Sequence, residues 1–418
     1  MRFRLMRLVD QFLGSLLCRT VGLVLWVCRK HIRRADHPAP PEPDGVREIL
    51  VLKFLGMGSV LQATPLFQAL RRHYPAARVT LLTFQANRAL RDFDLGIDAV
   101  VTVDPSGVWR FVASNVKVLW QLRRTRFDLV LNLEFFAAYG TLLTWMLRKR
   151  FAMAFGGFAH YRDKFFHDFV SYDNAQHIQE KFFNFARRLG YGGPLPPLAK
   201  LHVGHPAQIV AETERRLDFR LEPDDYRILV NINTGEMAPR RRWPLEHYRV
   251  VVERLLRRPG VRCLLLGGPG DRGQVDAFQA SLSRPGQVVN LAGRINLREL
   301  VALMEVSDLY LGNDSGPLHF AACVGLPVLA LFGPESPQVY GPPVSPRNTV
   351  LYRAEPCSPC LNVYSDKHSP CQDNVCLKRI PPERVLEVLD SRYLNGKVKA
   401  GASALLPLPL VDEPVSVS

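Results

Sequence analysis

The sequence predicts two α/β domains, each a parallel sheet with helices on both faces, which is a doubly wound architecture. Short apolar runs rich in β-branched residues alternate with segments of helical periodicity, as in βαβ units. The second half of the chain repeats this alternation, and a Pro- and Gly-rich stretch at residues 191–200 separates the halves. With 418 residues, 47% of them hydrophobic, the chain is long enough for two cores. We therefore expect domains at residues 47–195 and 205–392.

The elements follow from the same periodicities. In the first half we expect strands at 47–55, 77–84 and 127–136, and helices at 60–75 and 174–190. In the second half we expect strands at 226–233, 261–268, 287–293, 308–314 and 327–333, and helices at 245–258, 269–282 and 296–307. Asn296 and Glu299 have the spacing of a capping box and mark where the last of these helices begins.

The N-terminal segment, residues 1–35, is basic and apolar at once. Residues 1–36 hold eight Lys or Arg against two Asp, and the apolar run between them is short and interrupted by Arg19. Polar or small residues recur on roughly one helical face, which predicts an amphipathic helix on an anionic membrane surface. A helix packed on the protein and a single-span anchor remain alternatives. In each case we expect a cytoplasmic catalytic body, with a Pro-rich linker at 36–46 and a disordered tail at 396–418.

Three loops of the second domain carry polar groups at strand ends, where open α/β sheets bind ligands. The first offers Thr234, the backbone of Gly235, and Arg241. The second ends in Asp271, a carboxylate suited to ribose hydroxyls. The third, at residues 313–319, begins a helix whose N-terminus favours phosphate, and Asp314, Ser315, Gly316 and His319 lie in it. Each motif alone could be helix capping or packing, but three at successive strand ends predict a nucleoside diphosphate site.

The stretch "NDSGPLHFAACVGLPVLALFGPESP" resembles the hallmark of glycosyltransferase family 9, the ADP-heptose:lipopolysaccharide heptosyltransferases. "RRRWP" at 240–244 and "ILVLKFLGMGSVLQATPLFQALRRHYP" at 49–75 resemble two further elements of that family. The resemblance implies a GT-B fold, in which two Rossmann-like domains face a central cleft, with the acceptor on the first domain and the nucleotide sugar on the second. It also implies an inverting transfer that requires no metal ion or other cofactor.

By position, the resemblance assigns roles within the second domain. Thr234 and Arg241 would hold phosphates, Asp271 the ribose, and Ile295 would lie near the base. The residues Asp314, Ser315, Gly316 and His319 would hold the sugar and the diphosphate.

The first domain departs from the family pattern where the catalytic base is expected. The family usually has Gly-Asp in the first loop, and this chain has Gly58-Ser59. An unactivated serine is a poor base at neutral pH. Glu134, at the end of an apolar strand, is our candidate for the base, with a surface ion pair or a helix cap as the alternative. In a further alternative, Ser59 only orients the acceptor.

Eight cysteines fall into two groups. Cys18, Cys28, Cys263 and Cys323 lie in apolar runs and are expected in a core or against a membrane. Cys357, Cys360, Cys371 and Cys376 cluster in a pattern that a structural zinc site, free thiols or a disulfide would each explain.

The net charge of +15 suits an acidic, phosphorylated glycolipid at a membrane, and no nucleic-acid-binding motif accompanies it. The leading hypothesis is an inverting transferase that moves a heptose or similar sugar, ADP-linked, to a lipopolysaccharide-type or other lipid-linked acceptor. It would act peripherally on the inner face of the cytoplasmic membrane. The alternatives are a non-catalytic relative that binds nucleotide sugar or glycolipid, and another sugar-nucleotide enzyme such as an epimerase.

Overall fold

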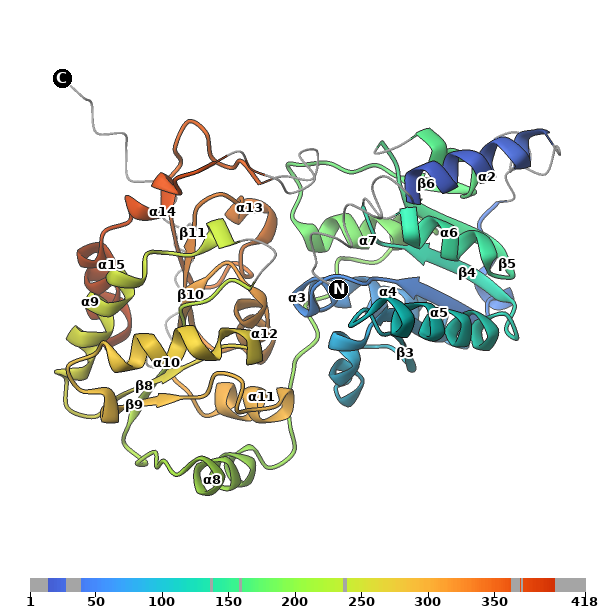
Figure 1. Cartoon of the computed structure of the whole chain (residues 1–418). Coiled ribbons are helices and arrows are strands. Elements are labelled where there is room, and N and C mark those ends of the chain that lie inside the picture. The colour runs from blue at the N-terminus through green and yellow to red at the C-terminus, as the bar shows by residue number, and fades with distance from the viewer. Residues whose placement is uncertain are drawn as a thin grey trace. The chain divides into compact units, whose positions relative to one another are not determined.

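A computed structural model describes residues 14–27, 39–135, 138–157, 160–235, 239–361, 369 and 371–394. The chain divides into two compact units, Met1–Ala199 and Lys200–Ser418, each with its own sheet (Figure 1). The disordered tail expected at 396–418, and Cys28, lie outside the described residues.

Unit 1 is built on a six-stranded parallel sheet with the order β3-β2-β1-β4-β5-β6. The chain starts in the middle, steps outward to β3, returns to β4 beside β1 and continues to the other edge, as a doubly wound sheet does. Its strands are β1 (Glu48–Leu52), β2 (Arg78–Phe84), β3 (Ala99–Val103), β4 (Phe127–Asn132), β5 (Lys149–Phe155) and β6 (Asp168–Val170). The central strands are buried on both faces, which explains their continuous apolar runs.

Helices cover both faces of this sheet. The helices of unit 1 are α2 (Ser15–Val27), α3 (Met57–Gln62), α4 (Thr64–His73), α5 (Val108–Leu122), α6 (Ala138–Met146) and α7 (Ile178–Arg188). Side chains from α2, α5 and α6 share one buried cluster with Leu50 and Leu52 of β1 and thus lie on one face of the sheet. Elsewhere in the unit α4 packs against α7, whose own core residues include Phe182 and Phe185.

The N-terminal helix α2 packs on the protein through part of its surface. Cys18 is buried and its thiol lies 3.7 Å from the carbonyl oxygen of Ala138 in α6. Leu16, Leu17 and Leu23 are exposed. Among the described residues, no helix has the length and apolarity needed to cross a membrane.

Unit 2 repeats the architecture with a parallel sheet of order β12-β11-β10-β7-β8-β9. Its strands are β7 (Tyr226–Asn231), β8 (Val261–Leu265), β9 (Val288–Asn290), β10 (Leu309–Asn313), β11 (Val328–Phe332) and β12 (Thr349–Tyr352). Its helices are α8 (Pro206–Leu217), α9 (Leu245–Leu256), α10 (Arg272–Ala280), α11 (Leu297–Glu305), α12 (Gly316–Val324), α13 (Pro337–Tyr340), α14 (Val375–Lys378) and α15 (Pro382–Val388), with a last π-helical turn at Leu389–Leu394. The two parallel sheets confirm the predicted fold class.

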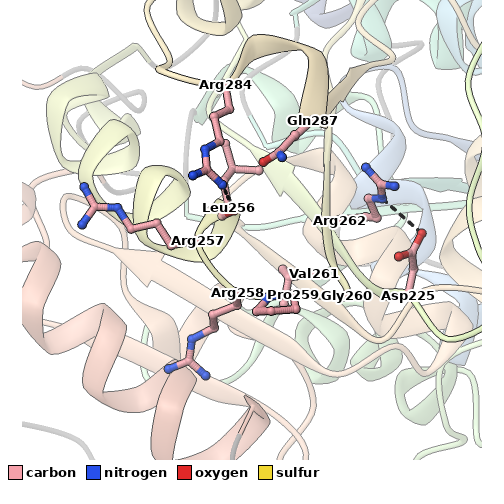
Figure 2. Close-up of a pocket in the computed structure, with 10 residues that line it drawn as sticks. All are labelled: Asp225, Leu256, Arg257, Arg258, Pro259, Gly260, Val261, Arg262, Arg284 and Gln287. Atoms are coloured by element: carbon pink, nitrogen blue, oxygen red, sulfur yellow. Dashed lines mark hydrogen bonds and ion pairs between the residues drawn. The ribbon is translucent and has the colours of Figure 1, made fainter.

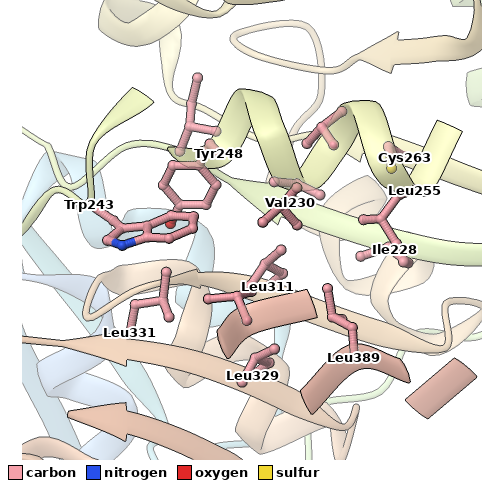
Figure 3. Close-up of a cluster of buried hydrophobic side chains, with 14 of the residues drawn as sticks. Ile228, Val230, Trp243, Tyr248, Leu255, Cys263, Leu311, Leu329, Leu331 and Leu389 are labelled. Atoms are coloured by element: carbon pink, nitrogen blue, oxygen red, sulfur yellow. The ribbon is translucent and has the colours of Figure 1, made fainter. Parts of the chain in front are cut away.

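The loop after β7 is anchored in the core of unit 2 by Trp243. Trp243 is fully buried, packs edge-on against Tyr248 with ring centroids 4.8 Å apart, and donates its indole N–H to the carbonyl of Ile380 at 3.0 Å (Figure 3). Since Arg241 and Arg242 precede this anchored tryptophan directly, the anchor fixes where their side chains can reach. The predicted capping box is also confirmed, because the Asn296 side chain accepts from the Glu299 N–H and Glu299 returns the bond.

Candidate functional site at the strand ends

The carboxyl ends of β7 and β10 are joined by asparagine side chains. The Asn313 amide oxygen accepts from the Trp243 N–H at 2.8 Å, and its nitrogen lies 3.4 Å from the carbonyl of Asn233. The Asn231 amide donates to the Ser315 hydroxyl at 2.8 Å. These contacts bring the loop after β7 against the loop after β10, so the first and third predicted motifs do meet.

An ion pair lies where the two loops meet. Arg241 Nη1 is 2.9 Å from Asp314 Oδ2, and both side chains are largely buried. Burial alone would lower the pKa of Arg241, but the carboxylates of Asp314 and Glu335 outweigh it and raise that pKa above its usual value. The guanidinium is thus a fixed positive charge at the strand ends.

Several donors in the two loops have no hydrogen-bond partner among the described residues. The hydroxyl of Thr234 is buried without a hydrogen bond to any described residue, and the same holds for the Nε atoms of Arg241 and Arg242. A buried polar atom left unpaired costs about 1–3 kcal/mol, so such groups cluster where a ligand supplies the partner. Gly235 follows Thr234 with φ +71, a conformation in which side chains are strained. The arrangement fits an anionic ligand with several acceptor oxygens.

Helix α10, which follows the loop after β8, contacts the site through a chain of side-chain hydrogen bonds. Arg242 Nη1 donates to the Gln274 side chain at 2.7 Å, and Gln274 donates to the Asn233 side chain at 2.8 Å. Asp271 caps its own turn, accepting from the Gly268 N–H at 2.9 Å. This turn holds the Asp271 carboxylate in the loop after β8. The contact of Asp271 with a ribose stays a prediction.

The remaining predicted residues lie on neighbouring elements of the same edge. Ile295 is half-buried between the end of β9 and α11. Ser315 stands at the N-cap of α12, Gly316 is exposed at the first helical position, and His319 is buried in the first turn. Gly316, exposed at the start of α12, therefore offers its backbone N–H beside Asp314, whereas Pro317 has no N–H and the Leu318 N–H donates to the Ser315 carbonyl at 3.2 Å.

Unit 1 carries a second buried ion pair at its own strand ends. Glu134, two residues past β4, lies 3.0 Å from Lys53 Nζ, one residue past β1. The same Glu134 oxygen accepts from the N–H groups of Phe54 and Leu55 at 2.5 and 3.2 Å. The buried Arg162 donates to the carbonyl oxygens of Phe135 and Glu134. One Glu134 oxygen is therefore held by three donors, and no hydrogen bond from a described residue reaches the other.

Ser59 lies in the loop that Glu134 holds. Gly56 begins α3 with φ +76, and the Ser59 N–H donates to the Gly56 carbonyl at 3.0 Å. Ser59 is half-buried in the first turn of α3. Because Glu134 fixes the backbone of residues 54 and 55, Ser59 and Glu134 belong to one loop cluster.

The cysteine prediction is resolved in part. Cys263 and Cys323 are buried, and burial raises the pKa of each to about 12. Burial and the neighbouring thiols raise the pKa of Cys376 to about 12. Within the described ranges no three His, Cys, Asp or Glu side chains are placed to hold a metal ion. The thiol of Cys371 instead donates to the carbonyl of Asp373 at 2.7 Å. The zinc site at Cys357, Cys360, Cys371 and Cys376 stays a prediction, since much of the chain between Cys360 and Cys371 lies outside the described residues.

A hollow of about 250 Å³ lies at the amino ends of β7, β8 and β9, opposite the strand ends that form the site above (Figure 2). Arg257, Arg258, Arg262 and Arg284 line it, and Arg262 is paired with Asp225 at 3.2 Å. Because it lies at the other ends of the strands, it is separate from the site above.

Sequence reasoning missed the groups that hold the site together. Asn231, Asn233 and Asn313 stand at the ends of otherwise apolar strands, and that contrast is a signal that could have found them. Lys53, Gln274 and Glu335 gave no comparable signal, because their partners are distant in the sequence.

Comparisons with known proteins agree with this geometry. The model of glycosyltransferase family 9 (heptosyltransferase) matches residues 116–369. Lipooligosaccharide heptosyltransferase 2 of Haemophilus influenzae is 34% identical over 160 residues, which cover 38% of this chain and 45% of that protein. The match thus spans less than half the length of that relative.

Two solved structures show the same fold. A family 9 glycosyl transferase from Veillonella parvula is 23% identical with a TM-score of 0.70, and the match covers 85% of this chain and 99% of that one. The E. coli ADP-heptose LPS heptosyltransferase II is 22% identical with a TM-score of 0.68, covering 83% and 99%. These likenesses and the two six-stranded sheets confirm the GT-B fold class.

Proposed function

Because this chain belongs to glycosyltransferase family 9, we propose that it is an inverting heptosyltransferase that uses a nucleotide sugar. The donor is an ADP-linked heptose or a similar sugar, and the acceptor is a hydroxyl of a lipopolysaccharide-type glycolipid. The relatives named above as heptosyltransferases support the sugar and the acceptor. The protein works peripherally at the inner face of the cytoplasmic membrane.

One observation of the structure carries the proposal for the donor: the Thr234 hydroxyl is buried without a partner among the described residues, in the loop that the Asn233 carbonyl joins to Asn313, next to the Asp314 that pairs with Arg241. A diphosphate would accept from the Thr234 hydroxyl, from Arg241 and from the Gly316 N–H at the start of α12. In the reaction an acceptor oxygen forms a bond to the anomeric carbon while the bond from that carbon to the diphosphate breaks. The same three groups meet the charge that develops on the leaving diphosphate.

Within the donor site, Asp271 holds the ribose and Ile295 packs near the base. Ser315, Gly316 and His319 hold the sugar and diphosphate together with Asp314. Their places on the loops after β8, β9 and β10 support these roles, because all three loops leave the same edge of the sheet.

The acceptor hydroxyl must lose a proton, and we propose Glu134 as the base that takes it. One carboxylate oxygen is held by Lys53 and two N–H groups, and the other has no hydrogen-bond partner among the described residues. The held oxygen fixes the orientation of the group, and the other oxygen is the one that would accept the proton. Ser59 orients the acceptor from the same loop cluster.

This chemistry requires no divalent cation, since Arg241, the Thr234 hydroxyl and the helix N-terminus meet the diphosphate charge. A structural zinc ion at Cys357, Cys360, Cys371 and Cys376 would staple a loop and is not needed for the transfer.

Calorimetric titration with ADP, GDP and UDP, and a transfer assay in the presence of EDTA, test the proposal. We expect ADP to bind most tightly and transfer to continue in EDTA. Arg241→Ala should weaken ADP binding and lower kcat/KM by about 30- to 1000-fold, the equivalent of roughly 2–4 kcal/mol.

Arg220→Ala is the matched control, because Arg220 is an exposed arginine of the same unit, paired with Glu222. It should behave as wild type. Wild-type kinetics in Arg241→Ala would refute the phosphate role. If the protein binds the donor but shows no transfer or hydrolysis above background, it is a non-catalytic relative. A changed sugar formed without an acceptor would indicate an epimerase.

A further inference from the structure

Helix α5 of unit 1 exposes an apolar stripe that the core does not use. Val108, Trp109, Val112, Val116 and Trp120 are all exposed, Trp109 by 84% and Trp120 by 62%. Residues four apart lie on one side of a helix, so these side chains form a continuous stripe along the length of α5. An ordinary protein surface exposes apolar residues singly, whereas this stripe is contiguous and contains two tryptophans.

The same helix already has a separate core face. Val118 and Leu122 are buried in the cluster under the sheet, and Phe111 and Leu119 pack against it. The apolar arc of α5 is therefore wider than contact with the sheet requires. None of the five exposed residues of the stripe belongs to the buried cluster of unit 1.

Two neighbouring helices on the same face of the sheet also expose apolar side chains. Leu16, Leu17 and Leu23 are exposed on α2, and Trp145 is exposed on α6. Both helices share the buried cluster with α5, through Cys18 of α2 and Leu143 of α6. The exposed groups thus belong to one side of unit 1, which we name the α2-α5-α6 face.

The charges of this face have one sign. The sequences of α2, α5 and α6 contain no Asp or Glu. Exposed basic residues lie on these helices and in the turns that follow them: Arg19, Arg110, Lys117, Arg123, Arg124 and Arg148. The Arg124 guanidinium lies 3.4 Å from the centre of the Trp120 ring, so cation and aromatic ring are presented together. Asp104, ahead of α5, and Asp163, beside α2, stand at the margins.

We propose that the α2-α5-α6 face docks on an anionic lipid surface, with Trp109 and Trp120 inserted at the depth of the headgroups. Tryptophan rings prefer this depth, and arginine and lysine bind the acidic headgroups around them. A second copy of the chain is a poorer occupant. A symmetric dimer through this face would bring its basic residues together without acidic partners.

The inference deepens the proposed function, since a glycolipid acceptor lies in such a surface, but its basis is independent of the transfer reaction. It assigns membrane contact to α5 as well as to the N-terminal helix. Two weak contacts on one rigid unit bind a surface more tightly than either alone.

The test is co-sedimentation of the full chain with vesicles of phosphatidylcholine alone or with about one third phosphatidylglycerol. We expect binding to the anionic vesicles that weakens as salt is raised. The double variant Trp109→Ser/Trp120→Ser should bind at least about tenfold more weakly, because both apolar anchors are removed. ADP affinity should not change, so this result is read separately from the proposed function.

Val344→Ser is the control, because Val344 is 68% exposed in unit 2 and lies outside this face. It should bind the vesicles as wild type does. In the unmutated protein, vesicles with brominated acyl chains should quench tryptophan fluorescence, and the quenched fraction should fall in the double variant. Equal binding by the double variant and wild type would overturn the proposal. So would a dimer in solution that depends on Trp109 and Trp120.

Discussion

Each unit has a buried ion pair where its central strands end, and the two pairs differ in what surrounds them. In unit 1 Glu134 accepts from Lys53 and from two backbone N–H groups through one oxygen. In unit 2 Arg241 donates to Asp314, while Arg241 Nε and the nearby Thr234 hydroxyl have no partner among the described residues.

The difference lies in how each buried charge is met. A buried charge is expensive unless it is paired and hydrogen-bonded, and in unit 1 Lys53 and two N–H groups of the loop after β1 meet one oxygen of Glu134. The pair in unit 2 leaves donors without acceptors, which is tolerable where a ligand brings acceptor oxygens. We infer that the unit 1 pair holds a loop and a carboxylate in position, whereas the unit 2 pair is part of an anion-binding site.

Glu134→Gln should have the largest effect on turnover. The amide keeps the shape of the side chain and removes its basicity, so kcat should fall by about 10²–10⁴-fold with little change in ADP affinity. The measurement is steady-state transfer together with calorimetric titration. A variant within a few-fold of wild type would exclude Glu134 as the base, and Ser59→Asp would then be the informative substitution.

Lys53→Met should have the largest effect on stability. Removing one partner of a buried pair leaves the other charge uncompensated, at a cost of about 3–5 kcal/mol. We expect this loss in urea unfolding of unit 1. Lys117→Met, at an exposed position of the same unit, is the matched control and should change little. An unchanged Lys53→Met protein would show that the pair contributes nothing to the fold.

Thr234→Val should leave the stability of the free protein unchanged or slightly higher and should lower its affinity for ADP. Without ligand the variant should be as stable as wild type or slightly more so, because a buried hydroxyl with no partner is removed. With ADP, affinity should fall about 3- to 10-fold, the value of one hydrogen bond. Thermal unfolding with and without ADP measures both effects. A clear loss of stability in the absence of ligand would mean that the hydroxyl serves the fold instead.

Lys149 should give an effect on stability that depends on pH. Burial lowers the pKa of Lys149 from its usual value of 10.5 to about 8. Between these values the unfolded chain binds more protons than the folded one, so this group makes stability rise with pH from about 8 to about 10. The difference in unfolding free energy between wild type and Lys149→Met should show this slope. A difference that is flat over the same range would contradict it.

The local features of both units could be predicted from the sequence, because periodicity and capping depend on neighbours in the chain. The strands β1, β2 and β4 of unit 1, the strands β7 to β11 of unit 2 and the Asn296–Glu299 capping box are examples. The Lys53–Glu134 pair could not be predicted, because it depends on β1 lying beside β4, with the partners 81 positions apart in the sequence. Cys18 was expected in a core or against a membrane, and only the packing of α2 on α6 decides for the core. The exposed stripe on α5 was missed because apolar periodicity does not show which apolar face is covered.

Amide hydrogen exchange with and without ADP tests the comparison of the two pairs most directly. The account predicts that ADP slows exchange in residues 226–235 and 309–319 of unit 2 and leaves residues 48–59 and 127–135 of unit 1 unchanged. The protection should be lost in Arg241→Ala and retained in Lys53→Met. Protection centred on residues 48–59, or protection of unit 2 that survives in Arg241→Ala, would contradict the account.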